Sequence, residues 1–559
     1  MSSTASDTLT DTPLSGYSTP EDTPRVGDYL KLESSESIKA NAHTGTVNAR
    51  IWLKYEDEKT QVFSGPHRPL AQHKIEQQFT VGSELNHTTV LLTGATGYVG
   101  SLLLELILRI APDVRKIYLL IRDKKGVRAQ DRLKELISGP VFQYQNPDLI
   151  LPKLEVVPAD MTEPGCGLSQ TESSTICRSV NYVIHCAAAI RFDMKVQDIL
   201  KQTYAPTENL LKLAAAAPKM RCFCFISTAF VNANLPKGTV VEEKIYPLVT
   251  TSPLEGPVIG RHLLDLSPEE ADAEADNLMA LNGLQNTYFL AKNLTERMVA
   301  AYDGRPHRVC ILRPSIIGSV ARAPCPGFIG NSSGFTAAIL GAAAGIVAFV
   351  QHDPNSVVTI VPGDMVASVT LLAMTAHGYA AERGFAPPCN NIVHACTSDT
   401  NPVTSHKLHV MCCTYLNEDP PKGGTLAQEF RVDWVTNPVL FWVRCLMHSI
   451  LVGLTALMLR WQGKPRLAKR LSFAWEKWRE LASSRFDFNI IFQTTAVRIL
   501  QQQLGPEEEG PLRVSWTAEQ DSWLRYLRTY VAGTKHLYRG EIPTVFDTQD
   551  YRPQAVAEK

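Results

Sequence analysis

One short segment, TTVLLTGATGYVG at 88–100, constrains the possible folds of this chain more than any other. An apolar run leads directly into a glycine loop, and residues 101–110 then carry apolar side chains at helical spacing. A strand, a glycine turn and a helix in this order are typical of dinucleotide-binding folds, in which a helix N-terminus meets the phosphates. The loop residues expected to contact such a cofactor are Thr93, Gly94, Thr96, Gly97, Tyr98, Val99 and Gly100.

Alternating strands and helices continue for more than 200 residues after this loop. Helical periodicity occurs at 132–137, 207–217 and 288–302. Continuous apolar runs predict strands, and such runs indicate a parallel sheet that is covered on both faces. These strands are expected at 116–122, 153–160, 180–188, 221–231 and 308–318. The sequence therefore predicts an α/β fold with a Rossmann-type doubly wound parallel sheet, followed by a mostly helical C-terminal domain.

We expect three parts along the chain. Residues 1–87 form a disordered or poorly defined N-terminal extension, because their Ser/Thr-rich start cannot bury enough apolar surface to offset the entropy of ordering. Residues 88–436 form the dinucleotide-binding domain with substrate-binding insertions, and 437–559 form the helical domain. The N-terminus has neither the apolar core of a secretory signal nor the Arg-rich character of a transit peptide.

Composition excludes several classes of function. Lys and Arg number 55 against 56 Asp and Glu, so the chain has no global basic field and general nucleic-acid binding is excluded. The twelve cysteines include no CxxC pair, so we expect no metal site and a reducing compartment.

The apolar segment 437–461 leaves three alternatives open. Arg444 and His448 interrupt it, and its uninterrupted part, 449–459, is about half of the ~20 residues that a transmembrane helix needs. A buried helix, a helix lying at a membrane interface and a transmembrane span all fit this pattern.

Charged residues after the second predicted strand bear on which cofactor binds. Arg122, Lys124 and Lys125 form a positive cluster where an acidic residue would bind the ribose 2′-hydroxyl of NAD. An arginine near this position suits a 2′-phosphate, so the cluster favours NADP. Asp123 is the alternative, since its carboxylate could face the ribose. Asp160 ends the next strand and is expected either to meet the adenine or to cap its own loop.

A tyrosine and a lysine form the candidate catalytic pair. Tyr288 and Lys292 are four residues apart in a predicted helix and therefore share one face. A neighbouring ammonium favours the phenolate, which would bring the pKa of the phenol down from its usual value near 10. Lys292 can also hold the nicotinamide ribose. Thr228, at the end of the preceding strand, is the first candidate donor to a substrate oxygen, and Ser227 is the second.

Together these motifs resemble the short-chain dehydrogenase/reductase superfamily in its extended form, and more narrowly the alcohol-forming fatty acyl-CoA reductases. The resemblance covers roughly residues 88–540. Phe230 stands where this family usually has tyrosine, and 405–436 matches poorly, which leaves the acyl-chain preference open. The matching segments are TGATGYVG, LLIRDKKGVRAQDRL, HCAAAIRFD, STAFVN, YFLAK, LRPSIIG, GFIGNSSGFTAAILGAAAG, VPGDMVAS, IVHACTSDTNPVT and WLRYLRTYVAGTKHLY.

The resemblance implies NADPH-dependent reduction of a long-chain fatty acyl-CoA to a primary alcohol, through a bound aldehyde and with release of CoA. It also implies a fatty acyl-CoA partner and a membrane or lipid-droplet surface. We expect a cytosol-facing location on the endoplasmic reticulum or lipid droplets, with the peroxisome as another option, and predict no particular oligomeric state. The uncharged run 336–350 would line an acyl-chain tunnel or pack in the core.

Two further residues and three other functions stay open. His185 lines the nicotinamide pocket or is a core histidine, and Arg191 binds a CoA phosphate or forms a surface salt bridge. The alternative functions are a thioester reductase that stops at the aldehyde, a hydroxysteroid-dehydrogenase-like enzyme and a non-catalytic NADP sensor. The presence of both Tyr288 and Lys292 argues against the sensor.

Overall fold

The computed structural model describes residues 79–539, apart from 125, 252–253, 255, 305–306, 331–333, 344–348, 351–352, 419–432, 436 and 484–488. Most of the predicted N-terminal extension, 1–78, lies outside the described residues. Its last residues belong to the core instead: Phe79 is buried, and helix α3 (Val81–Leu85) packs against the first long helix of the fold, α4 (Tyr98–Ile110).

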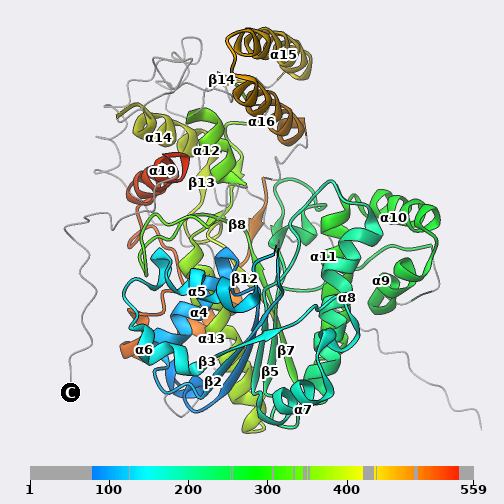
Figure 1. The fold of residues 1–559 in the computed structure, drawn as a ribbon, viewed down its shortest axis with the longest axis vertical. Coiled ribbons are helices and arrows are strands. Elements are labelled where there is room, and N and C mark those ends of the chain that lie inside the picture. Colours follow the sequence, from blue (N-terminus) through cyan, green and yellow to red (C-terminus); the bar gives the residue numbers. More distant parts are fainter. Residues whose placement is uncertain are drawn as a thin grey trace, which may run out of the picture.

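A seven-stranded sheet forms the centre of the molecule (Figure 1). Its strands are β1 (Thr89–Thr93), β2 (Lys116–Ile121), β3 (Leu154–Pro158), β4 (Tyr182–His185), β5 (Cys222–Ile226), β7 (Arg308–Pro314) and β12 (Ile392–Ala395). They pair in parallel in the order β12-β7-β5-β4-β1-β2-β3. The predicted Rossmann-type doubly wound sheet is confirmed, and the strand order reverses between β1 and β4.

Helices cover both faces of the sheet, which explains the continuous apolar runs of its strands. Val90 and Leu92 of β1 belong to one core cluster, shared with α4 and α13 (Gly363–Glu382). Leu91 points to the other face, into the cluster shared with α8 (Val196–Ala215) and α11 (Thr287–Ala301). Successive strand residues thus alternate between two buried layers.

Several predicted strands end earlier than expected, and the difference is largest, at four or five residues, for two of them. The run at 221–231 stops at Ile226, because the Thr228 side chain accepts a hydrogen bond from the Phe230 N–H at 3.3 Å and begins a 3-10 turn, η6 (Ala229–Asn232). The run at 308–318 stops at Pro314. Both corrections put polar side chains at the carboxyl ends of strands.

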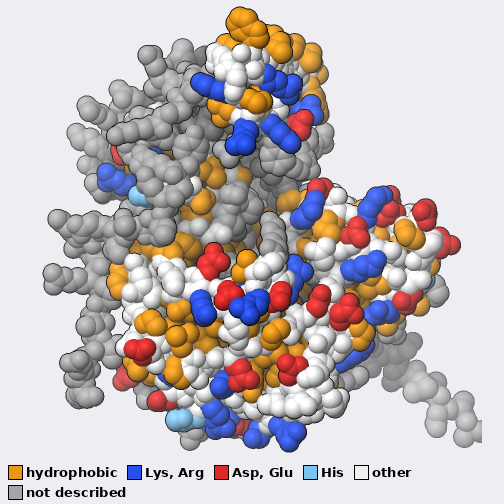
Figure 2. All heavy atoms as spheres, viewed as in Figure 1, with side chains coloured by type: hydrophobic (Ala, Val, Ile, Leu, Met, Phe, Trp, Pro, Cys, Tyr) orange, Lys and Arg blue, Asp and Glu red, His pale blue; other side chains and the backbone are white. Residues whose placement is uncertain are grey.

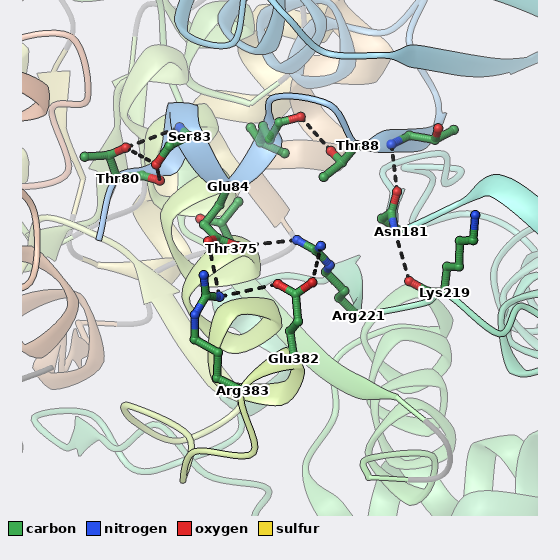
Figure 3. A network of polar contacts seen from close by, with 12 residues as sticks. Thr80, Ser83, Glu84, Thr88, Asn181, Lys219, Arg221, Thr375, Glu382 and Arg383 are labelled. Carbon is green, nitrogen blue, oxygen red and sulfur yellow. Dashed lines mark hydrogen bonds and ion pairs between the residues drawn. The ribbon is translucent and has the colours of Figure 1, made fainter. Parts of the chain in front are cut away.

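A network of ion pairs between two glutamates and two arginines connects α3, β5 and α13 at the amino end of the sheet (Figure 3). Glu84 of α3 pairs with Arg221, which precedes β5, and with Arg383, which follows α13, each at 3.4 Å. Glu382 pairs with the same two arginines. Burial raises the pKa of Glu84 while the two arginines lower it. This network fixes the sheet at the end opposite the carboxyl termini of its strands.

The C-terminal region is helical in its described part, and its helices pack on different parts of the molecule. Helix α17 (Thr495–Gln501) packs on β12 and α13 of the sheet domain. Helix α19 (Trp523–Arg539) packs on α12 (Phe335–Ala343) and α14 (Ser405–Glu418). Helices α15 (Pro438–Trp461) and α16 (Pro465–Ser483) pack on each other and lie together at the top of Figure 1.

Within the described part of the chain, α15 is the one helix whose length and composition would allow it to cross a membrane. Only 17% of its most apolar window is buried, so the expectation of a buried core helix is wrong for 437–461. The interfacial and spanning alternatives remain.

Candidate active site

A cavity of about 840 Å³ lies at the carboxyl ends of the parallel strands. Open α/β sheets bind ligands at this edge, where the strand order reverses. One part of its wall comes from the glycine loop, the strand ends and α11, and the other from α12 and α14. A single cavity therefore connects the predicted cofactor and catalytic residues with an apolar pocket.

The glycine loop has the shape that the sequence predicts. Gly94 has φ +73°, and a Cβ there would lie 2.8 Å from the Ala187 nitrogen. A Cβ at Gly100 would lie 2.1 Å from the Gly94 oxygen, so only glycine allows this helix–strand approach. Gly97 is the N-cap residue before α4 and has no side chain that could cap the helix, which leaves N–H groups of the first turn for an anion.

The predicted loop residues divide into two groups. Thr93 is buried beneath the loop, and its hydroxyl accepts a hydrogen bond from the Ala187 N–H at 3.2 Å. Thr93 and Gly100 are not among the residues that line the cavity, so they support the loop from behind. The loop residues that do line the cavity are Gly94, Thr96, Gly97, Tyr98 and Val99.

Three cationic side chains gather beside this loop. Arg122 and Lys124 line the cavity as predicted. Arg132 of α5 (Ala129–Ile137) also lines it and donates to the Arg122 carbonyl at 2.7 Å and to the Thr96 hydroxyl at 2.8 Å. Our sequence reasoning missed Arg132, although it lies in the matching segment LLIRDKKGVRAQDRL.

The two acidic candidates differ in position. Asp123 accepts a hydrogen bond from the Ala129 N–H at 2.8 Å, so it caps α5 and is not among the cavity-lining residues. Asp160 lines the cavity and also caps its own loop. Hydrogen bonds from the side chain and backbone of Thr162 lower the pKa of Asp160.

Tyr288 and Lys292 are both buried, and both line the cavity from α11. The Lys292 ammonium donates to the Ile226 carbonyl at 2.8 Å and lies 4.6 Å from the centre of the Phe225 ring. Burial lowers the pKa of Lys292 to about 8. Burial raises the pKa of Tyr288, so the predicted lowering of that pKa is not observed. The phenol therefore stays protonated near neutral pH and can donate a proton.

Three hydroxyl side chains that follow strands of the sheet, Ser227, Thr228 and Ser315, line the same cavity near Tyr288 and Lys292. Ser227 and Thr228 follow β5, and Ser315 follows β7. Within the described part of the chain, the buried Ser227 hydroxyl makes no hydrogen bond, and the buried Ser315 hydroxyl interacts only with the Cys396 thiol. Ser315 was not predicted, because nothing in a strand-end serine alone distinguishes it from a loop residue. Buried polar groups without a partner are costly, so the Ser227 hydroxyl above all is suited to a ligand.

The two tentative substrate residues lie elsewhere. His185 is buried between Thr93, 2.8 Å from Nδ1, and Thr207, 3.0 Å from Nε2. Burial lowers the pKa of His185 to about 3, so it is a neutral core histidine, as in the second alternative. Arg191 is exposed and pairs with Asp193 at 2.9 Å, which favours the surface salt bridge. Neither residue is among those that line the cavity.

The apolar part of the cavity lies between helices outside the sheet. Its wall includes Trp478 of α16 together with Ala338, Ile339 and Val350 from the run 336–350, which favours the tunnel over core packing. The start of the poorly matching stretch 405–436 supplies another wall. The helical residues concerned are Phe335, Ala338 and Ile339 of α12 and Leu408, Cys412 and Leu416 of α14.

A Rossmann-type sheet with this glycine loop and a buried Tyr–Lys pair defines a nicotinamide-dependent oxidoreductase. Residues 92–370 match the family model described as male sterility protein. Fatty acyl-CoA reductase 1 of Rattus norvegicus is 31% identical over 460 residues, which cover 80% of this chain and 84% of the relative. The Homo sapiens protein of that name is 30% identical over 461 residues, with the same coverage. The chain belongs to the fatty acyl-CoA reductase family and is an oxidoreductase.

Two solved structures share the fold. The terminal R domain of the myxalamid pathway has a TM-score of 0.52 and 18% identity, with 82% of this chain and 92% of that chain covered. The reductase domain of a nonribosomal peptide synthetase from Mycobacterium tuberculosis also has a TM-score of 0.52 and 18% identity, with coverage of 80% and 92%.

Proposed function

We propose that this enzyme reduces long-chain fatty acyl-CoA to a primary fatty alcohol with NADPH, releasing CoA and holding the aldehyde between the two reductions. One observation carries the proposal: a single cavity joins the glycine loop and the Tyr288–Lys292 pair to an apolar pocket walled by α12 and α14. The relatives named fatty acyl-CoA reductase support the same substrate class.

The choice of NADPH rests on the charges beside the glycine loop. A 2′-phosphate would meet Arg122, Lys124 and Arg132, all of which line this part of the cavity. Asp123, the one residue that favoured NADH, is hydrogen-bonded to the start of α5 instead. Arginine binds phosphate through two N–H groups at once, so these contacts would favour NADPH over NADH.

The glycine loop fits the rest of the cofactor. The uncapped start of α4, which meets the cavity at Gly97, would receive the pyrophosphate with its free N–H groups. Lys292 would bind the nicotinamide ribose, and Asp160 would lie near the adenine. When bound, the reduced nicotinamide would supply the hydride for each reduction.

The protein's own groups would act on the carbonyl oxygen and on the proton. Hydrogen bonds from Thr228, Ser227 and Tyr288 would stabilise negative charge developing on that oxygen. A thiol has a pKa near 8.5, so CoA can leave as the thiolate with little help from an acid. Reduction of the aldehyde requires a proton, and the neutral Tyr288 would deliver it as general acid.

We keep the division into 88–436 and 437–559 as part of this proposal, together with a cytosol-facing site of action on the endoplasmic reticulum, on lipid droplets or on peroxisomes. The exposed apolar helix α15 supports a membrane location but does not distinguish among these organelles.

The test is a product assay on purified protein with NADPH and acyl-CoA substrates of increasing chain length. Gas chromatography should find the fatty alcohol, with two NADPH consumed for each CoA thiol released. One NADPH per thiol and an aldehyde product would mean a thioester reductase instead. A protein that binds NADPH but releases no thiol from any acyl-CoA would contradict the proposal.

A further inference from the structure

Helix α15 exposes one continuous apolar face. Six large apolar side chains on it are each at least 55% exposed, namely Trp442, Leu446, Met447, Ile450, Leu454 and Leu457. Figure 2 shows hydrophobic side chains gathered at the top of the molecule, where Figure 1 labels α15. A protein that stays in water rarely leaves such a contiguous apolar surface uncovered, so this face requires an apolar partner.

The opposite face of α15 is packed against α16. Phe441 and Cys445 are buried in a small core with Trp475 and Trp478 of α16. The indole N–H of Trp475 donates to the Ser449 hydroxyl at 3.0 Å. The two helices therefore form one unit, which we call the α15–α16 pair (Pro438–Ser483).

This packing argues against α15 crossing a bilayer. The connection and the first turns of α16 carry Lys464, Arg466 and Lys469, which are all exposed. Arg444 of α15 pairs with Asp433 at 3.0 Å. If α15 spanned the bilayer, α16 beside it would be immersed as well, and the exposed Glu476 and Arg479 in the middle of α16 would lie in the hydrocarbon layer, which is strongly unfavourable. A pair with one apolar face and basic flanks is instead typical of a helix that lies in the membrane interface.

The charge of the pair fits an anionic lipid surface. Residues 437–483 contain eight Lys and Arg against two Glu, whereas the rest of the chain contains 47 against 54. In Figure 2, basic side chains lie directly beside the exposed apolar face. Positive charge next to an apolar helix face attracts membranes that contain anionic lipids.

We propose that the α15–α16 pair docks the enzyme on an anionic lipid bilayer, with α15 lying in the plane of the interface. Trp478 belongs to this pair and also lines the apolar end of the active-site cavity. Docking therefore brings the apolar end of the cavity to the membrane, so that an acyl tail can pass from the bilayer into it. This last step rests on the proposed function, whereas the docking itself does not.

Vesicle flotation with the full-length protein tests the docking. The protein should bind vesicles of phosphatidylcholine and phosphatidylserine about tenfold more strongly than vesicles of phosphatidylcholine alone. The combined variant Leu446→Asp, Ile450→Asp and Leu454→Asp should lose binding to both. Leu149→Asp with Leu151→Asp is the matched control, because these exposed leucines lie far along the chain from α15, and its binding should be unchanged. Equal binding by the α15 variant and the wild type would overturn the proposal.

Charge reversal tests the headgroup preference separately. Lys464→Glu, Arg466→Glu and Lys469→Glu together should remove the preference for phosphatidylserine, and these exposed positions leave the apolar packing of the pair intact. If this variant still preferred vesicles that contain phosphatidylserine, the proposed attraction between these basic residues and anionic headgroups would be wrong.

Labelling of the two helix ends distinguishes an in-plane helix from a spanning one. Pro438→Cys and Gln462→Cys place a thiol at either end of α15. With wild-type labelling subtracted, a membrane-impermeant maleimide added outside the vesicles should react with both positions. Reaction at only one of them, with the other reacting after detergent is added, would show that α15 spans the bilayer.

An activity control keeps the docking and the proposed function apart. The α15 aspartate variant should retain NADPH-dependent reduction of a water-soluble short-chain acyl-CoA in lipid-free buffer. Activity without vesicle binding in this variant supports docking. Wild-type vesicle binding without reductase activity on any substrate would leave the docking intact and contradict the proposed function.

Discussion

The cavity has two halves that are built differently. In the half above the sheet, polar groups are held by hydrogen bonds to the strands and the loop, such as Lys292 to the Ile226 carbonyl and Arg132 to Thr96. In the half between α12 and α14, the wall is mainly apolar side chains on helices outside the sheet. The positions of the reacting groups therefore depend on the ends of the strands, whereas the shape of the lipid pocket depends on how the outer helices pack. Chemistry and chain selectivity should therefore respond to different substitutions.

The largest effect is expected in the half above the sheet. Tyr288→Phe removes the hydroxyl that we propose as proton donor, so kcat/KM for alcohol formation should fall about 10²- to 10⁴-fold. Fluorescence titration should show unchanged NADPH binding. Tyr144→Phe, at an exposed position, is the control. Full activity in Tyr288→Phe would show that Tyr288 is not the proton donor and that the reacting groups do not lie where we place them.

The preference for NADPH over NADH should depend on two arginines in the half of the cavity above the sheet. Arg122→Gln combined with Arg132→Gln should weaken NADPH binding about 10- to 100-fold, because the charge-assisted hydrogen bonds of the two arginines together contribute roughly 1.5–3 kcal/mol. NADH binding should change little. An equal loss for both cofactors would mean that these arginines support the loop and do not bind a 2′-phosphate.

The pH dependence of kcat/KM should follow the ionisation of the buried Lys292. Burial lowers the pKa of Lys292 to about 8, so its ammonium is present below that pH and is lost as the pH rises through it. The kcat/KM of the enzyme should therefore fall above pH 8 by about tenfold per pH unit. Lys292→Arg keeps the charge and should remove this limb, at a lower overall rate. A wild-type profile that stays flat to pH 10 would contradict the role of the charge.

The smallest effect is expected in the apolar half. Ala338→Phe adds bulk to the wall formed by α12 and should shorten the preferred acyl chain. Each methylene that no longer fits costs about 0.8 kcal/mol, or roughly fourfold in kcat/KM. Rates with a short-chain acyl-CoA should be unchanged, which is the internal control. Equal loss at all chain lengths would place the acyl tail elsewhere.

Much of the sheet and the polar half of the site could be predicted from local sequence pattern. Apolar runs and a glycine loop are local signals, and they located Gly94 in the loop before α4 and Tyr288 in the helix α11. Arg132 and Ser315 were missed because they reach the cavity only through the tertiary fold.

The pKa of Tyr288 could not be predicted either, because it depends on burial rather than on the spacing to Lys292. The strand predicted at 221–231 was too long, because the cap formed by Thr228 ends it.

The most direct test of the central claim follows hydrogen from the cofactor to the lipid. Purified enzyme would be given palmitoyl-CoA and NADPH carrying deuterium at both C4 positions, and the products analysed by mass spectrometry. Our account predicts a fatty alcohol with two deuterium atoms on C1, because one cavity holds the carbonyl beside the cofactor for both reductions. A final product without deuterium, or an aldehyde with a single deuterium that is never reduced further, would contradict it.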